Sequence, residues 1–477
     1  MFKTLKNAWG IIDLRKKILF TLLIVVLYRL GACIPVPFVD AGYMASSEIF
    51  KSGIFQYLNI ISGEALGKAT LLALGVSPYI TASIVVQLLT IAIPAFEKWS
   101  KEGEEGKKKL NVVTRIFTIA LALVTSIGYV MMLNNESGVL NFGMVDGKAV
   151  EGNFFHYMII VLCYCAGAAI VMWLAEKINE SGIGNGISII LFANIIAGIY
   201  STATIMWELI FPSTFPVGKP AWVEKLGGFD WLGAVVVFGF LVVLLGLILI
   251  VVWMSDAERR IPIQYAKRVV GRKMYGGQNT NLPLKVNMTG VMPIIFANSI
   301  VTIPATLATV LGNFTKWKWV DSVSEWITEW FNYDSWAYLV IFMVLLVAFA
   351  YFYVMISFNP VEVANNIKNN GGAIPGIRSG RPTVEFIKKV LYRITLVGAL
   401  LVVFVACFPM LINNILSIEG IQTAFSEAGR VAQYYVSLFT TLAFGGSSLM
   451  IVVGVALETT RELEAQMSLR NYKGFLD

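Results

Sequence analysis

The sequence predicts an all-α, polytopic membrane protein in which ten transmembrane helices form two inverted five-helix halves. Three observations predict this fold. Hydrophobic residues make up 57% of the 477-residue chain and charged residues only 14%, a balance that a soluble protein of this length could not keep in solution. Ten apolar runs are long enough to cross roughly 30 Å of hydrocarbon. A short pattern also recurs at the same place in each set of five runs.

The apolar runs give the positions of the predicted helices. They begin near Ile18, Leu71, Ile116, Tyr157, Ile187, Trp231, Val291, Ala337, Ile394 and Tyr434. An even number of spans puts both termini on one side. The segments on that side hold 28 Lys and Arg residues against 15 Asp and Glu, whereas the opposite loops hold 8 against 15. Because basic loops stay in the cytoplasm, both termini are predicted to be cytoplasmic.

Three connecting segments are longer than a turn requires. The predicted cytoplasmic loops 255–286 and 359–389 are rich in Arg, Lys, Gly and Pro. The predicted outer segment 36–68 contains the stretch IISGEALG at residues 60–67, which is too short and too glycine-rich to span a bilayer. We therefore expect a re-entrant piece there.

A short internal sequence repeat predicts the two halves. GVSPYITA at residues 75–82 resembles GVMPIIFA at 290–297, and each opens the second run of a set of five. Since five is odd, the halves 1–225 and 226–477 must be inverted about an axis in the membrane plane, with a central pathway between them. A chance match stays open, because Pro and Gly are common in membrane helices.

Few ionisable groups lie inside the predicted spans, which disfavours a pump or an ion-coupled transporter. Arg29 either reaches the interface or pairs with another helix. His156 is expected at the surface, at an outer helix end. The cysteines show no metal or redox spacing, and we expect neither a metal nor a cofactor: Cys33, Cys163, Cys165 and Cys407 all lie in apolar runs.

A pathway without charge can still exclude water and ions through a ring of apolar side chains. Val76 and Ile80 are spaced i, i+4 and share a helix face, and Ile295 is the equivalent of Ile80 in the second half. Ile187, Leu191 and Ile451 are candidates for the rest of the ring. The alternative is that these side chains face lipid or the protein core, as most Ile and Val in spans do.

Four motifs together resemble the SecY family of protein-conducting channels. They are ALGVSPYI at 73–80, GIGNGIS at 182–188, FNP at 358–360 and PGIRSGRPT at 375–383. The resemblance runs from the basic N-terminus to Asn471. It implies a channel that passes unfolded secretory polypeptides across the plasma membrane and releases apolar segments sideways into lipid.

The resemblance also implies roles for particular residues. A central hourglass pore would be narrowed by the ring Val76, Ile80, Ile187, Leu191, Ile295 and Ile451. A plug at about 55–72 would include Ser62, Gly63, Glu64, Ala65, Leu66 and Gly67. A lateral gate would run between the second and third helices on one side and the seventh and eighth on the other.

The same resemblance implies partners. The family works with the small membrane subunits SecE and SecG, and the motor ATPase SecA or the ribosome docks on the basic loops. The expected docking residues are Arg259, Arg260, Lys267, Arg268 and Arg378. Retention of topology alone explains about half of the basic residues in these loops. No enzymatic activity is expected, and the runner-up function is a secondary transporter of a small solute.

Overall fold

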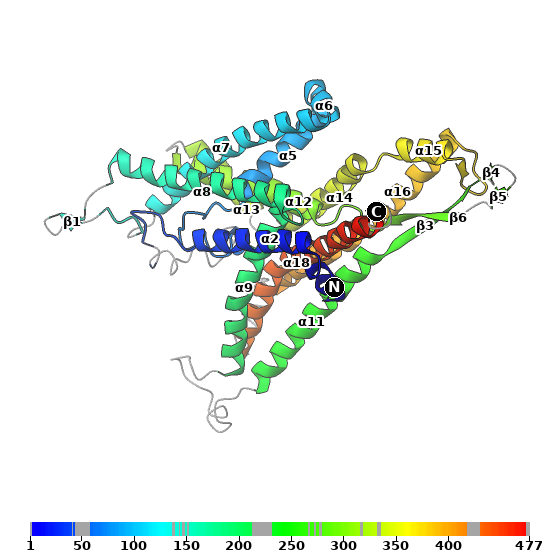
Figure 1. Ribbon diagram of the computed structural model, residues 1–477. Coiled ribbons are helices and arrows are strands. Elements are labelled where there is room, and N and C mark those ends of the chain that lie inside the picture. Colours follow the sequence, from blue (N-terminus) through cyan, green and yellow to red (C-terminus); the bar gives the residue numbers. More distant parts are fainter. Residues whose placement is uncertain are drawn as a thin grey trace.

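The computed structural model describes residues 2–40, 42, 58–135, 139–142, 144–145, 148–149, 152–211, 231–265, 268–270, 273–275, 279–314, 318–331, 335–416 and 430–473. Helices dominate these residues (Figure 1). The ten longer helices are α2 (Ile12–Gly31), α5 (Ser77–Ala92), α7 (Glu104–Asn135), α8 (Phe154–Ser181), α9 (Gly186–Ile210), α11 (Trp231–Asp256), α12 (Met292–Phe314), α14 (Trp336–Ser357), α16 (Arg381–Leu416) and α18 (Arg430–Lys473). Shorter ones are α1 (Phe2–Trp9), α6 (Pro94–Lys101), α13 (Lys318–Trp330) and α15 (Pro360–Asn369).

Each of the ten expected apolar runs corresponds to one of the longer helices. By length and apolar composition alone, six of the described helices can cross a bilayer, or seven if α5 and α6, which are bent by 102° at their junction, form one span. The helix α2 fails this test because Arg15, Lys16 and Lys17 lie inside its first turns. With so many apolar helices, the chain is a multi-pass membrane protein.

The two copies of the internal repeat share a backbone geometry. Gly75 and Gly290 have φ values of +55° and +61°, a left-handed conformation that only glycine adopts at little cost. A helix begins two residues later in each case, with Pro78 or Pro293 at its second position, where the missing N–H would be unpaired anyway. This geometry starts α5 at Ser77, after the expected Leu71, and residues 71–76 form turns.

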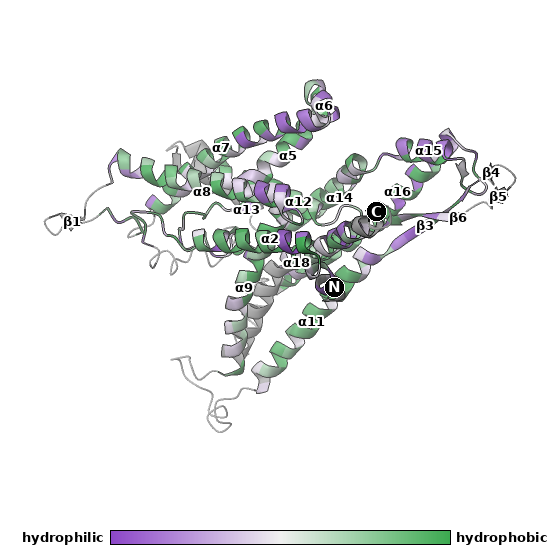
Figure 2. Ribbon diagram, in the orientation of Figure 1, coloured by the Kyte–Doolittle hydropathy of each residue, from purple (hydrophilic) through white to green (hydrophobic). Residues whose placement is uncertain are grey.

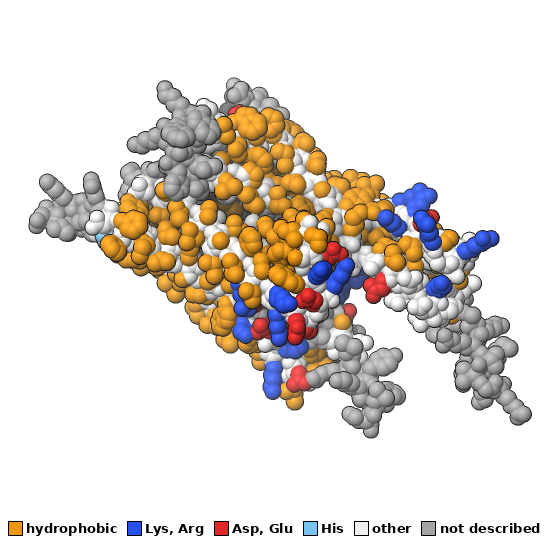
Figure 3. Space-filling model, turned by 90° about the horizontal axis from the view of Figure 1, so that it is seen from above, with side chains coloured by type: hydrophobic (Ala, Val, Ile, Leu, Met, Phe, Trp, Pro, Cys, Tyr) orange, Lys and Arg blue, Asp and Glu red, His pale blue; other side chains and the backbone are white. Residues whose placement is uncertain are grey.

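The core and the outer surface are both apolar. The largest buried cluster joins side chains from α2, α5, α8, α9, α11, α12, α14, α16 and α18. Large apolar side chains also point outward, among them Leu249, Trp253 and Val344, each more than 60% exposed. Figure 2 shows the same apolar character along α8, α11 and α14, and Figure 3 shows a face on which hydrophobic side chains predominate. Exposed apolar surface on this scale fits contact with lipid.

The two predicted cytoplasmic loops are not purely irregular. The strand β3 (Glu258–Tyr265) pairs with β6 (Asn279–Lys285) on one edge and with β7 (Gly372–Ala373) on the other, both antiparallel. Two smaller hairpins are β4 (Arg268–Val270) with β5 (Lys273–Tyr275), and β1 (Met144–Val145) with β2 (Lys148–Ala149). The three-stranded sheet joins loop 255–286 to loop 359–389, a contact that the sequence did not predict.

The two ends of the chain lie together. The N-terminal helix α1 packs against α18, and the Thr4 hydroxyl donates a hydrogen bond of 2.9 Å to the Glu464 carboxylate. Ala8, Leu14 and Leu463 share a small buried cluster. Figure 1 shows the N and C labels close to each other near the end of α18.

Candidate functional site

A cavity of about 240 Å³ lies where five helices and the re-entrant segment meet. Its walls come from residues 58–66, from residues 73–76 and the start of α5, from the C-terminal half of α7, from α12, and from single residues of α9 and α18. None of the described lining residues carries a charge, so the cavity offers apolar and neutral polar contacts only. Helices from the N-terminal and C-terminal parts of the chain therefore line one cavity.

Five of the six predicted ring residues line this cavity, and all five are at most 5% exposed: Val76, Ile80, Leu191, Ile295 and Ile451. They belong to one buried cluster. Ile187 differs, because it is half-buried and packs against that cluster without lining the cavity. These side chains come from α5, α9, α12 and α18 or the turn just before α5, so no single helix supplies the group.

The wall contributed by α12 is partly polar. The hydroxyls of Ser299, Thr302 and Thr306 each donate to a carbonyl of their own helix, at 2.8 to 3.0 Å, and so are satisfied without a ligand. Both polar atoms of the buried Asn298 amide have no hydrogen-bond partner among the described residues. Leaving a buried amide unpaired is costly.

The re-entrant segment covers one end of the cavity. Of its described residues, 58–61 are helical and those that follow form consecutive turns. The Ser62 hydroxyl donates to the Asn59 carbonyl and accepts from the Leu66 N–H, while the Asn59 side chain accepts from the Gly67 N–H at 2.7 Å. Local hydrogen bonds thus satisfy a backbone that no regular helix or strand supports.

The predicted plug residues have different environments within this segment. Ser62 and Leu66 line the cavity, and Ala65 and Leu66 are buried. The Glu64 carboxylate pairs with Lys68 at 2.9 Å. Residues 55–57 of the predicted plug lie outside the described residues.

The helix α12 faces α5 and α7 across the cavity. Behind it, the Phe296 ring packs edge-on against Phe349 and Tyr353 of α14, with centroids 6.1 and 5.8 Å away. The cavity wall thus has α5 and α7 on one side and α12 on the other. The two sides meet where α12 contacts α5 and α7.

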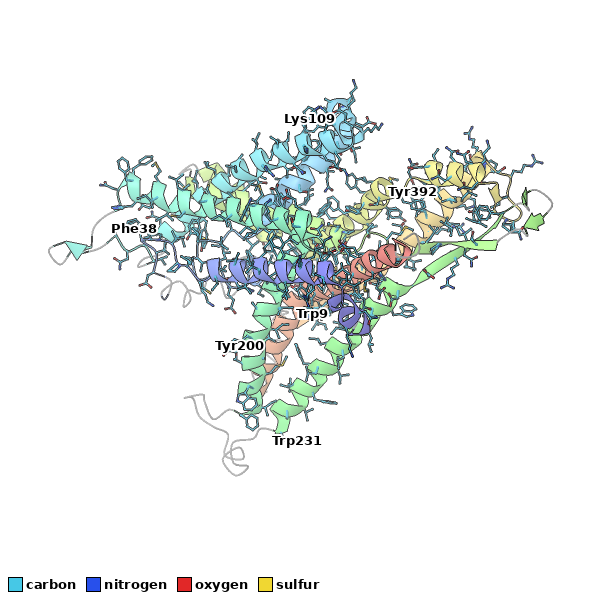
Figure 4. The ribbon with its side chains drawn as sticks, viewed as in Figure 1. Trp9, Phe38, Lys109, Tyr200, Trp231 and Tyr392 are labelled. Carbon is cyan, nitrogen blue, oxygen red and sulfur yellow. The ribbon has the colours of Figure 1, made fainter. Side chains whose placement is uncertain are left out.

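The two unusual ionisable residues have structural partners. The His156 ring nitrogen Nδ1 accepts the Asn153 N–H at 3.2 Å and so caps α8. Its ring packs on Phe38, which lies at the opposite end of the α7–α8 pair from Lys109 in Figure 4. Arg29 contacts carbonyl groups of another helix rather than reaching the interface. Among the described residues, no group of three or more His, Cys, Asp or Glu could hold a metal ion.

The second predicted site is the basic surface of the two paired loops. Arg259 and Arg260 are exposed on β3, and Arg260 pairs with Glu258 at 2.6 Å. Arg378 is exposed on a turn whose neighbours Ile374 and Ile377 pack into the buried cluster beneath. This anchoring directs the arginine away from the protein. Lys267 lies outside the described residues, and only the backbone of Arg268, in β4, is described.

A cation from α18 fixes the base of this surface. The Arg461 guanidinium donates to the Ser255 carbonyl at 2.6 Å and pairs with Asp256 at 2.8 Å. The pKa of Lys285 is lowered, first by partial burial of the Lys285 ammonium group and second by the positive charge of the nearby Arg461. The strand pairing itself was missed from the sequence, although the alternating burial of Ile261 and Ile263 along β3 is typical of a strand with one covered face.

Comparisons with known proteins agree with this geometry. A family model for SecY matches residues 70–460. The protein translocase subunit SecY of Streptomyces galbus is 41% identical over 483 residues, which cover 100% of both chains. A solved SecY channel, whose plug domain is described as stabilising the closed state and maintaining a membrane seal, gives a TM-score of 0.55 at 16% identity, over 94% of this chain and 92% of that one. Sec61 in a canine ribosome–channel complex gives a TM-score of 0.50 at 16% identity, with the same coverage.

The solved structures share the fold, and the similarity in sequence extends along the whole length of a curated relative. A ten-helix membrane protein with a charge-free cavity between its helices, and with this degree of identity, belongs to the SecY family.

Proposed function

We propose that the chain is the central, pore-forming subunit of a protein translocation channel. The observation that carries this proposal is the convergence of Val76, Ile80, Leu191, Ile295 and Ile451, from distant parts of the sequence, on one charge-free cavity beneath the re-entrant segment. A ring of apolar side chains seals by excluding water, and it selects no particular cargo chemistry. Such a ring suits polypeptides of varied sequence better than it suits one small solute.

Residues 55–72 act as the plug, and the boundary between α5 and α7 on one side and α12 and α14 on the other acts as the lateral gate. An apolar segment in an open gate partitions by the cost of each side chain in lipid. A Leu at mid-helix favours the bilayer by a few tenths of a kcal/mol, whereas a charged residue costs about 2.5 to 3.5 kcal/mol. The cargo sequence thus decides whether a segment crosses or enters the membrane.

The halves 1–225 and 226–477 are the two sides of this channel. The matched Gly75 and Gly290 geometry, each before a proline-initiated helix, supports an inverted repeat. The channel lies in the plasma membrane with both termini in the cytoplasm. The excess of basic residues on that side supports this orientation.

The paired loops 255–286 and 359–389 are the docking surface for SecA or the ribosome, through Arg259, Arg260 and Arg378 together with Lys267 and Arg268. SecE and SecG are its membrane partners. The exposed arginines support docking on an acidic or phosphate-rich surface. Energy comes from these partners, and the purified chain should hydrolyse no nucleotide.

The proposal is tested by crosslinking a stalled secretory preprotein to single cysteines in membranes that contain SecA and the partner subunits. The cysteines replace Ile80, Ile295 and Val344, one at a time, after removal of the four native ones. Val344 is 64% exposed on α14 and serves as the control that faces lipid. Adducts at Ile80 and Ile295 but not at Val344 are expected.

Adducts at none of these positions, with the preprotein engaged, would refute the pore assignment. A secondary transporter, the competing function, predicts saturable uptake of one solute in the absence of any preprotein. Membership of the SecY family favours the channel.

A further inference from the structure

The re-entrant segment is held by two side chains from different helices, Arg29 of α2 and Tyr129 of α7. We propose that these two residues form a latch that keeps the segment in its closed position, and that Tyr129 makes the latch sensitive to movement of α7. This inference rests on the proposed function, because it assigns the regulation of the proposed plug. Arg29 and Tyr129 are positioning residues, since they act through the segment and not on the cargo.

Arg29 is anchored mainly to the scaffold. Its Nη2 donates to the carbonyls of Ala193 and Asn194 in α9, at 2.8 and 3.2 Å. The adjacent Tyr28 hydroxyl accepts the Asn194 amide N–H at 2.9 Å, and both Tyr28 and Asn194 are at most 1% exposed. Two neighbouring residues of α2 therefore tie it to α9 inside the protein. The guanidinium keeps this position whether or not the re-entrant segment is present.

The third contact of Arg29 reaches the segment. Its Nη1 donates to the Gly63 carbonyl at 3.4 Å, the longest of the three distances. A Cβ at position 63 would lie 2.7 Å from Nη2, and the φ of Gly63 is +66°. Glycine has no Cβ and so suits both the left-handed turn and the close approach of the guanidinium. The contact that must break on opening is thus the weakest one that Arg29 makes.

Tyr129 holds the segment from the opposite side. Its hydroxyl donates to the Leu66 carbonyl at 2.5 Å, in a buried environment where the ring packs edge-on against Tyr164 at 5.2 Å. Tyr129 also lines the cavity, on the helix that faces α12. When α7 moves away from α12, the hydroxyl moves with it. The Leu66 carbonyl then either follows or loses this donor and keeps only the Ala69 N–H, at 3.1 Å, from within the segment. Opening of the wall and release of the segment are therefore coupled through one hydrogen bond.

The experiment measures how often the segment leaves its site. Ala65, at 1% exposure, is replaced by cysteine in a chain without native cysteines, and the rate of its alkylation by a maleimide is measured in the reconstituted complex without preprotein. Arg29→Gln is expected to raise this resting rate about tenfold and Tyr129→Phe about fivefold, since each loses one or more net hydrogen bonds. Arg29→Lys, which keeps the charge but lacks the planar fork, should restore part of the protection.

Two controls match the chemistry. Tyr157→Phe removes a hydroxyl that donates to Asn134 at an exposed site, and Arg115→Gln removes an ion pair with Glu176. Neither should change the alkylation rate. With a stalled preprotein engaged, the wild type and all variants should react equally fast, because the latch is then open in each of them. A general folding defect would persist under that condition.

The outcomes separate the latch from the function on which it rests. If preprotein accelerates alkylation in the wild type but Arg29→Gln and Tyr129→Phe react at the wild-type resting rate, the latch is refuted and the plug stands. If preprotein does not accelerate alkylation even in the wild type, the plug itself is refuted. Should Arg29→Gln fail to assemble, Tyr129→Phe decides alone, because phenylalanine keeps the ring packing.

Discussion

Replacing Ile295 with serine tests whether the ring seals the resting channel. Ile295 is 3% exposed and lines the cavity together with Ile80 and Leu191. Serine removes three apolar carbons at about 0.8 kcal/mol each, so wetting of the proposed constriction becomes about 2 kcal/mol less unfavourable. That difference corresponds to about a thirtyfold rise in the population of wetted, ion-conducting channels.

The assay is ion leak from proteoliposomes that contain the resting complex without motor or preprotein. Ile300→Ser is the matched control, because Ile300 lies on the same helix and packs against the same cluster but does not line the cavity. Ile295→Ser should leak, and Ile300→Ser should stay close to the wild type. Equal leak from the two variants, or none from Ile295→Ser, would show that the seal lies elsewhere.

Three further predictions concern the docking surface and the repeat. Arg378→Glu should weaken SecA binding roughly tenfold, mainly through slower association. Arg381→Glu, three residues away and also exposed, should leave binding unchanged. Binding kinetics measured at two salt concentrations test both expectations. Gly75→Ala should destabilise the protein by about 1 kcal/mol or more because of its left-handed φ, while Gly246→Ala in the open middle of α11 should not, as thermal denaturation will show. Ala373→Pro should break the β3–β7 pairing and speed proteolysis of the loops.

The helices were predictable because their signal is local. An apolar run of sufficient length can only be a helix in lipid, since every backbone group must be satisfied within the segment. The candidate ring was accessible for a related reason, because the repeated Gly-Val-x-Pro pattern aligns Ile80 with Ile295. Local sequence thus pointed to Val76, Ile80 and Ile295, and the resemblance to the SecY family assigned Leu191 and Ile451 to the same ring; all five line a cavity that the structure builds from distant segments.

Other features depend on partners that are far away in the sequence. Arg29 interacts with residues 34 and 164 or more positions later, and nothing near it in the chain identifies them. The pairing of Gln264 with Ala373 joins two loops across the four helices α12 to α15. The start of α5 at Ser77 was set by the positive φ of Gly75, which a hydropathy run beginning at Leu71 does not report. Each of these is a property of tertiary contacts or backbone torsion.

The same distinction explains how a membrane channel can hold a closed state. Lipid tails are as apolar as a leucine side chain, so burial of Leu66 against α7 favours the closed segment less than it would in water. Directional contacts carry more of the difference between closed and open. Arg29 donates to the Gly63 carbonyl and Tyr129 to the Leu66 carbonyl only while the segment is in place. Few such contacts are needed, because a closed state that must open on demand has to lie within a few kcal/mol of the open one.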